Sequence, residues 1–146
     1  MEIERTLQFV SNHWLLSSGH FFVTVLLLQD VFDTLTRKYK TASPARAVEL
    51  LNAEGTVIID VREPHEFAKG HIEGAQHVTL GRLKEKLFEL DQYKNSPVLV
   101  YCQQGTRSKE ACKQLAKEGF KQVYYLEGGI LTWQDQKLPL VKKSKK

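Results

Sequence analysis

The chain has 146 residues, of which 42% are hydrophobic and 26% charged, which excludes a largely disordered protein and allows one domain of ordinary size plus an appendage. The net charge of +4 is modest, and the lysine and arginine clusters lack the interleaved aromatic residues of a nucleic-acid platform, so we expect no nucleic-acid partner. Two cysteines are too few for a disulfide scaffold, and five scattered histidines show no metal-ligand spacing, so we expect neither a metal nor a cofactor.

The first forty residues contain a long uncharged segment. Residues 6–29 include no Asp, Glu, Lys or Arg, and a helix of about 20 residues crosses the roughly 30 Å core of a bilayer. We therefore predict an N-terminal hydrophobic helix that spans a membrane once, over about residues 9–28, followed by a basic linker up to residue 40. A cleavable signal peptide is disfavoured, because no basic segment precedes the apolar run and no small-residue cleavage site follows it. A helix that packs on the domain or mediates oligomerisation is the alternative.

The charges that flank this segment predict its orientation. Arg5 precedes it, whereas Arg37, Lys38, Lys40 and Arg46 follow it. Because basic residues favour the cytoplasmic side of a membrane, we expect a single-pass protein whose C-terminal domain faces the cytoplasm, where thiols stay reduced. The basic tail, residues 142–146, would either lie on an anionic membrane leaflet or remain a solvated terminus, and both readings stay open.

Helix and strand patterns alternate from residue 43 onward. Ser43 is a helix N-cap, followed by Pro44 at the first helical position. The predicted strands are residues 57–61, 75–79, 98–101 and 122–126; the predicted helices run from Pro44 towards Gly55, through Leu83, Leu87 and Leu90, over residues 108–118 and over residues 129–136. This alternation predicts an α/β domain with a parallel sheet covered on both faces and a ligand site beyond the carboxyl ends of its strands.

Cys102 lies at such an end. The apolar strand 98–101 leads directly into it, and a short loop containing Gly105 leads on to the helix that follows Arg107. Backbone N–H groups of the loop, the dipole of the helix and the permanent charge of Arg107 all favour the thiolate, which is the nucleophilic form of cysteine. The second cysteine, Cys112, falls about two turns into the helix and is expected to be a small buried hydrophobic residue.

The segment from Cys102 to Arg107 resembles the Cys-x-x-Gly-x-Arg active-site loop of the rhodaneses, a family of sulfurtransferases. Residues 56–78, which contain Asp-x-Arg, Glu-Phe and Gly-His-Ile-x-Gly-Ala, and residues 126–133, which contain Gly-Gly, resemble two further blocks of this family in the same order. A phosphatase loop has one more residue between cysteine and arginine, so the shorter loop disfavours a phosphatase or arsenate reductase. The resemblance covers about residues 41–141 and implies a single rhodanese-like domain there.

The resemblance also implies an activity. The Cys102 thiolate would take a sulfane sulfur from a donor such as thiosulfate or a persulfide, and the resulting persulfide would pass it to a thiol or cyanide-like acceptor, which includes a protein thiol. The alternative is a membrane-tethered interaction module that has the rhodanese fold but no physiological turnover. The intact loop favours the enzyme.

Roles for the other site residues follow from the same resemblance. The loop residues expected to bind the substrate or the persulfide sulfur are Gln103, Gln104, Gly105, Thr106, Arg107 and Ser108. Arg107 would either pair with an anionic donor or brace the loop through backbone carbonyls, and both options stay open. Gln103 and Gln104 stand where many relatives carry a cation, which weakens the case for free thiosulfate as the favoured donor. Asp60 and Arg62 are expected to support the site as a structural pair, and Glu66 and His71 to serve in packing and capping.

Overall fold

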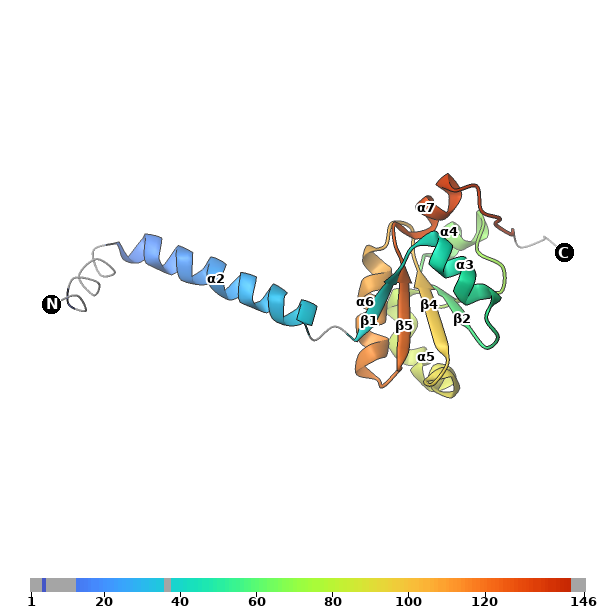
Figure 1. Cartoon of the computed structure of the whole chain (residues 1–146), viewed down its shortest axis with the longest axis horizontal. Helices are drawn as coiled ribbons and strands as arrows, with labels where there is room; N and C mark the ends of the chain where they lie inside the picture. The colour runs from blue at the N-terminus through green and yellow to red at the C-terminus, as the bar shows by residue number, and fades with distance from the viewer. Residues whose placement is uncertain (1–3, 5–12, 36–37, 143–146) are drawn as a thin grey trace. The chain divides into compact units, whose positions relative to one another are not determined.

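The computed structural model describes residue 4, residues 13–35 and residues 38–142 (Figure 1). The chain divides into two compact units, residues 1–37 and residues 38–146. Most of the predicted basic tail, residues 143–146, lies outside the described residues. The second unit contains the whole sheet and therefore the candidate site.

The N-terminal unit contains the helix α2 (Trp14–Leu35), so a helix is present where one was predicted. Large apolar side chains such as Phe21 and Phe22 are exposed on it, at 71% and 64%. Residues 9–12 of the predicted membrane span lie outside the described residues. Within the described ones, no helix combines the length and the apolar character needed to cross a bilayer. The predicted span is therefore not supported, and the orientation inferred from flanking charge stays a prediction.

A five-stranded sheet forms the centre of the second unit. In chain order its strands are β1 (Tyr39–Ala42), β2 (Val57–Asp60), β3 (Gln76–His77), β4 (Pro97–Tyr101) and β5 (Gln122–Leu126). Their order across the sheet is β1-β5-β4-β2-β3, and every neighbouring pair is parallel, as predicted. All four residues of β2 are buried, because strands of a parallel sheet are covered on both faces. The edge strand β1 begins at Tyr39, inside the segment expected to be a linker.

Helices cover both faces of the sheet. They are α3 (Pro44–Asn52), α4 (Pro64–Ala68), α5 (Leu83–Leu90), α6 (Thr106–Lys117) and α7 (Gly129–Asp135), with 3₁₀ turns η1 (Leu80–Arg82) and η2 (Asp91–Tyr93). One core cluster joins the sheet to α5 and α6 through residues such as Leu83 and Leu115, and another joins it to α3 and α7 through residues such as Leu50 and Trp133. This confirms the predicted α/β fold, in which a parallel sheet is covered by helices on both faces.

Two local signals account for the starts of α3 and α4. The Ser43 hydroxyl accepts a hydrogen bond from the Arg46 N–H at 3.3 Å, so Ser43 is the predicted N-cap. The short helix α4 was not predicted, because a single turn leaves no apolar periodicity to read. It is held by a capping box, in which the Glu66 carboxylate accepts the Glu63 N–H at 2.8 Å, and by Pro64 at its first position.

Candidate active site

Cys102 follows the last residue of β4, and α6 begins four residues later at Thr106. Only 1% of Cys102 is exposed. Gly105 takes a φ of +103° at the N-cap of α6, a left-handed conformation that glycine adopts without steric cost. The chain can thus turn back on the cysteine, and the Gly105 N–H donates a hydrogen bond to Cys102 Sγ at 3.0 Å. The sulfur therefore faces a backbone donor at the start of a helix, where negative charge is stabilised.

The first two carbonyls of the loop point towards α7. The Cys102 carbonyl accepts the Ile130 N–H at 2.9 Å, and the Gln103 carbonyl accepts the Leu131 N–H at 3.3 Å. In a trans peptide the N–H points opposite to the carbonyl, so the N–H groups of Gln103 and Gln104 point away from α7. The start of α7 thus fixes the orientation of the loop. These contacts were not predicted, because the sequence analysis treated residues 126–133 only as a block that resembles the family.

The second glycine of the Gly-Gly pair, Gly129, is required for steric reasons. Gly129 adopts a φ of +63°, and a Cβ there would lie 2.5 Å from both the Cys102 and Gln103 carbonyl oxygens. Such a contact is shorter than van der Waals packing allows, so only glycine lets α7 approach the Cys102 loop this closely. Gly129 is therefore a supporting residue of the candidate site.

Ser108 closes the loop from the other end. Its hydroxyl donates to the Gly105 carbonyl at 2.8 Å, and the Cys102 thiol lies 3.5 Å from the same Ser108 oxygen. Ser108 is fully buried, whereas the side chains of Gln104 and Thr106 are exposed. Among the predicted loop residues, Ser108 is thus placed to contact the sulfur through its side chain.

The Arg107 guanidinium binds the carboxylate of Glu66, a partner that was not predicted. Two hydrogen bonds of 2.8 Å join Arg107 Nη1 and Nη2 to the two carboxylate oxygens. Hydrogen bonding from Arg107 lowers the pKa of Glu66 from 4.5 to about 2, and the same bonds raise the pKa of Arg107. The capping role expected of Glu66 is confirmed, and the ion pair is additional. The sequence held no signal for it, because the partners are 41 residues apart.

Asp60 and Arg62 form a buried ion pair, with side chains 0% and 4% exposed. Arg62 Nη2 lies 2.6 Å from the Asp60 carboxylate and donates a second bond, of 2.7 Å, to the Gly70 carbonyl. Arg62 Nη1 donates to the Gln103 side-chain oxygen at 3.4 Å. The pair therefore joins the carboxyl end of β2 to the loop that carries Cys102, as a supporting pair would.

Cys112 and two histidines near the site are in structural positions. Cys112 is buried in α6, and burial raises the pKa of its thiol well above the ordinary value. His71 and His77 stack on the Phe67 ring, at centroid distances of 3.8 and 4.5 Å. His71 packs as expected, and no group of three or more His, Cys, Asp or Glu among residues 13–35 and 38–142 is arranged to hold a metal ion.

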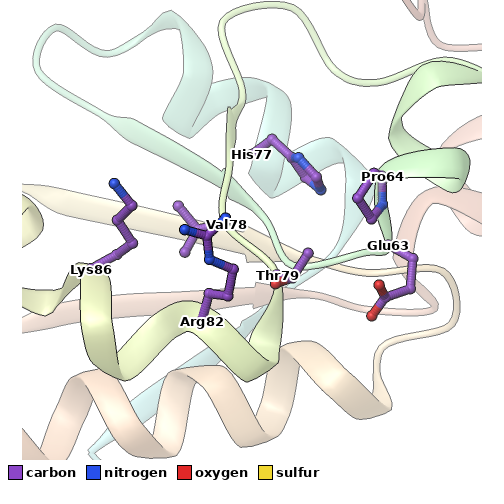
Figure 2. Close-up of a pocket in the computed structure, with 7 residues that line it drawn as sticks. All are labelled: Glu63, Pro64, His77, Val78, Thr79, Arg82 and Lys86. Atoms are coloured by element: carbon purple, nitrogen blue, oxygen red, sulfur yellow. The ribbon is translucent and has the colours of Figure 1, made fainter.

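Two cavities adjoin the segments around the site. The first has a volume of about 440 Å³ and is lined by Arg62, His65, Glu66, Lys69, Gly70, Gln103, Ile130 and Gln134. The second, of about 290 Å³, is lined by Glu63, Pro64, His77, Val78, Thr79, Arg82 and Lys86 (Figure 2). Only the first includes a residue of the Cys102 loop, so it is the better candidate for a molecule that approaches the cysteine.

Comparison with known proteins agrees with this geometry. Residues 43–136 match the Rhodanese-like domain family. The uncharacterized protein YibN of Escherichia coli K12 is 34% identical over 141 residues, which is 96% of this chain and 99% of that protein. The thiosulfate sulfurtransferase GlpE of Coxiella burnetii is 40% identical over 95 residues, 65% of this chain and 87% of that enzyme.

A solved structure of a rhodanese-related protein from Thermoplasma volcanium aligns with a TM-score of 0.65 at 28% identity. The alignment covers 72% of this chain and 100% of the Thermoplasma volcanium chain. The sheet order, the loop from Cys102 to Arg107 and these relatives converge on one assignment. The chain belongs to the family of proteins with a Rhodanese-like domain.

Proposed function

We propose that the chain is a sulfurtransferase that carries sulfane sulfur on Cys102. The Cys102 thiolate attacks the outer sulfur of the donor, the donor's sulfur–sulfur bond breaks, and its electron pair leaves with sulfite or a thiolate. The acceptor then attacks the outer sulfur of the Cys102 persulfide and releases the Cys102 thiolate. Since enzyme and acceptor both need reduced thiols, the proposal requires a reducing compartment such as the cytoplasm.

The hydrogen bond from the Gly105 N–H to Cys102 Sγ, at 3.0 Å, is the observation that carries this proposal. A backbone donor aimed at sulfur stabilises the thiolate before attack and again when it is the leaving group. The four residues between Cys102 and Arg107 make a small cradle, which favours a sulfur atom over a phosphate group. The likeness to thiosulfate sulfurtransferases of the GlpE type supports the same reaction class.

Within the loop from Cys102 to Ser108, no side chain offers an unpaired cation to a donor. Arg107 is bound by Glu66 and Arg62 by Asp60, and Gln103 and Gln104 are neutral. Thiosulfate is a dianion and gains most from an unpaired cation. We therefore propose that a persulfide of a small thiol is a better donor than thiosulfate.

Mass spectrometry of the intact protein tests the proposal. After incubation with a thiol persulfide or with thiosulfate, we expect one added sulfur atom on the native protein and on the Cys112→Ala variant, and none on Cys102→Ser. Addition of a second thiol should remove the sulfur and return the original mass. A folded native protein that gains no sulfur from either donor would refute the proposal.

A second candidate function is an interaction module, because α2 exposes large apolar side chains such as Phe21, Phe22 and Leu27. In that case a partner would bind through α2 independently of the cysteine. Capture of the partner would be equal for the native protein and Cys102→Ser, and it would be lost when Phe21 and Phe22 are both replaced by serine.

A further inference from the structure

The 440 Å³ cavity adjoins the loop that carries Cys102. Gln103, which follows Cys102 directly, forms part of its lining, and the rest comes from α4, α7 and the residues next to them. Because the Gln103 carbonyl is held by the Leu131 N–H of α7, this part of the lining is fixed in place. A molecule bound in the cavity would therefore contact Gln103, the fixed residue that follows the reacting cysteine.

The lining contains one lysine whose charge is not balanced by a neighbour. Arg62 is paired with Asp60, and Glu66 is paired with Arg107. Among residues 38–142, no carboxylate forms an ion pair with Lys69, which is exposed. The amides of Gln103 and Gln134 add neutral hydrogen-bonding groups. The cavity therefore offers a net positive, polar surface to a ligand.

The second cavity differs in this respect. Its two cationic side chains, Arg82 and Lys86, each pair with a glutamate one turn further along α5, and Glu63 adds a carboxylate to the lining (Figure 2). Its charges are thus compensated within the protein. The contrast singles out the cavity at Lys69 as the place for an anionic group.

We propose that this cavity binds the carboxylate of a small thiol that accepts the sulfur, with Lys69 as the residue that sets this specificity. The inference rests on the proposed sulfurtransferase function. A volume of about 440 Å³ is large for thiosulfate and suits a thiol of drug-like size or below. A polar lining with one unbalanced cation suits a thiol that carries a carboxylate better than an apolar one.

The transfer step balances within this scheme. The acceptor's thiolate attacks the outer sulfur of the Cys102 persulfide and forms a new sulfur–sulfur bond. The bond between Cys102 Sγ and the outer sulfur breaks, and its electron pair stays on Sγ, which the Gly105 N–H faces at 3.0 Å. Lys69 takes no part in these bond changes. It holds the far end of the acceptor and is a specificity residue.

Two acceptors that differ only in charge test the proposal. The full chain, loaded with sulfur on Cys102, is mixed with 3-mercaptopropionate or with its uncharged amide. The second-order rate constant of sulfur transfer is measured for each acceptor. In Lys69→Gln we expect the ratio of acid to amide to fall about two- to fivefold, the range of one exposed ion pair, and in Lys69→Glu to fall further. The matched control Lys84→Gln removes an exposed lysine of α5 outside the cavity and should leave the ratio unchanged.

The ratio compares two substrates in one sample, so differences in folding or loading between variants cancel. Raising the salt concentration should lower the ratio in the native protein and not in Lys69→Gln, because screening weakens only a charge interaction. A ratio that is the same in the native protein and both Lys69 variants overturns this inference and leaves the proposed function standing. Failure of Cys102 to take up sulfur at all overturns both.

Discussion

The guanidinium of Arg107 holds both carboxylate oxygens of Glu66, each at 2.8 Å, and so joins the helix that follows the Cys102 loop to α4. The same carboxylate caps α4 through the Glu63 N–H. One side chain therefore stabilises a short helix and anchors the first turn of α6. The cation of the loop motif has a structural partner, and its effect on the sulfur is that of a fixed, largely compensated charge.

Replacement of Glu66 by glutamine should destabilise the fold in a pH-dependent way. The folded-state pKa of Glu66 is about 2, lowered from 4.5, so its stabilisation is fully present above about pH 4.5 and is lost as the pH falls towards 2. The pKa shift sets an upper bound of about 3 kcal/mol on what the Glu66 charge contributes to the unfolding free energy. Because Arg107 is partly exposed and solvent screens the pair, we expect a contribution of about 1–2 kcal/mol. Urea unfolding should show this difference at pH 7 and a shrinking one below pH 4.5.

The matched control for Glu66 is Glu54→Gln, since Glu54 is an exposed carboxylate in a turn far from the loop in sequence. Its unfolding free energy should differ from the native value by less than about 0.5 kcal/mol. If the gap between native protein and Glu66→Gln stayed constant from pH 7 to pH 2, the ion pair would not be its cause.

A methyl group at Gly129 should disrupt the Cys102 loop. In Gly129→Ala the new Cβ meets two backbone oxygens of the loop at 2.5 Å, and we expect a loss of about 3 kcal/mol or more together with slower sulfur uptake. Gly119→Ala is the control, because Gly119 has a similar positive φ of +90° but nothing within 4 Å of the new Cβ. It should cost about 1 kcal/mol and leave uptake unchanged. Equal effects of the two variants on uptake would argue against the close approach.

The sequence predicted the parts of this site that follow from local pattern. Apolar runs marked β2 and β4, and the position of Cys102 after β4 indicated the end of a strand and the start of a helix. The contacts of Arg107 with Glu66 and of Ile130 with the Cys102 carbonyl could not be read in this way, because they join segments separated by many residues. No spacing rule links side chains that meet only after the sheet has formed.

The edge strand β1 shows a second limit of the sequence. Its residues are Tyr39, Lys40, Thr41 and Ala42, and only Ala42 is buried. Without an apolar run, the basic residues of this segment suggested a linker. Pairing with β5 makes it a strand, and that pairing is a property of the assembled sheet.

Loss of the Asp60 charge should be among the most costly single changes in the domain. Asp60→Asn leaves the Arg62 guanidinium buried without a counter-charge, and we expect a loss of about 3–5 kcal/mol in unfolding free energy. Adding Arg62→Met to Asp60→Asn should recover part of the lost unfolding free energy, because the double variant no longer buries an uncompensated cation. The control is the exposed pair of Arg46 and Glu49, with side chains 55% and 64% exposed, where Glu49→Gln should cost less than about 0.5 kcal/mol. Equal costs for the two carboxylates would show that burial of the pair has no energetic weight.

Removal of the N-terminal unit should leave the rhodanese-like domain intact. Both core clusters, with the side chains packed against them, and all five strands lie within residues 39–140, so a chain that begins at Lys38 keeps every contact of the sheet. We expect it to unfold cooperatively and to take up sulfur on Cys102 as the full chain does.

A chain that begins at Ser43 is the control, because it lacks β1 and exposes β5, whose residues from Val123 to Leu126 pair with β1. Thermal unfolding should show a markedly lower Tm for the shorter chain. If instead the chain from Lys38 failed to fold, the prediction that the domain folds independently of the N-terminal unit would be wrong.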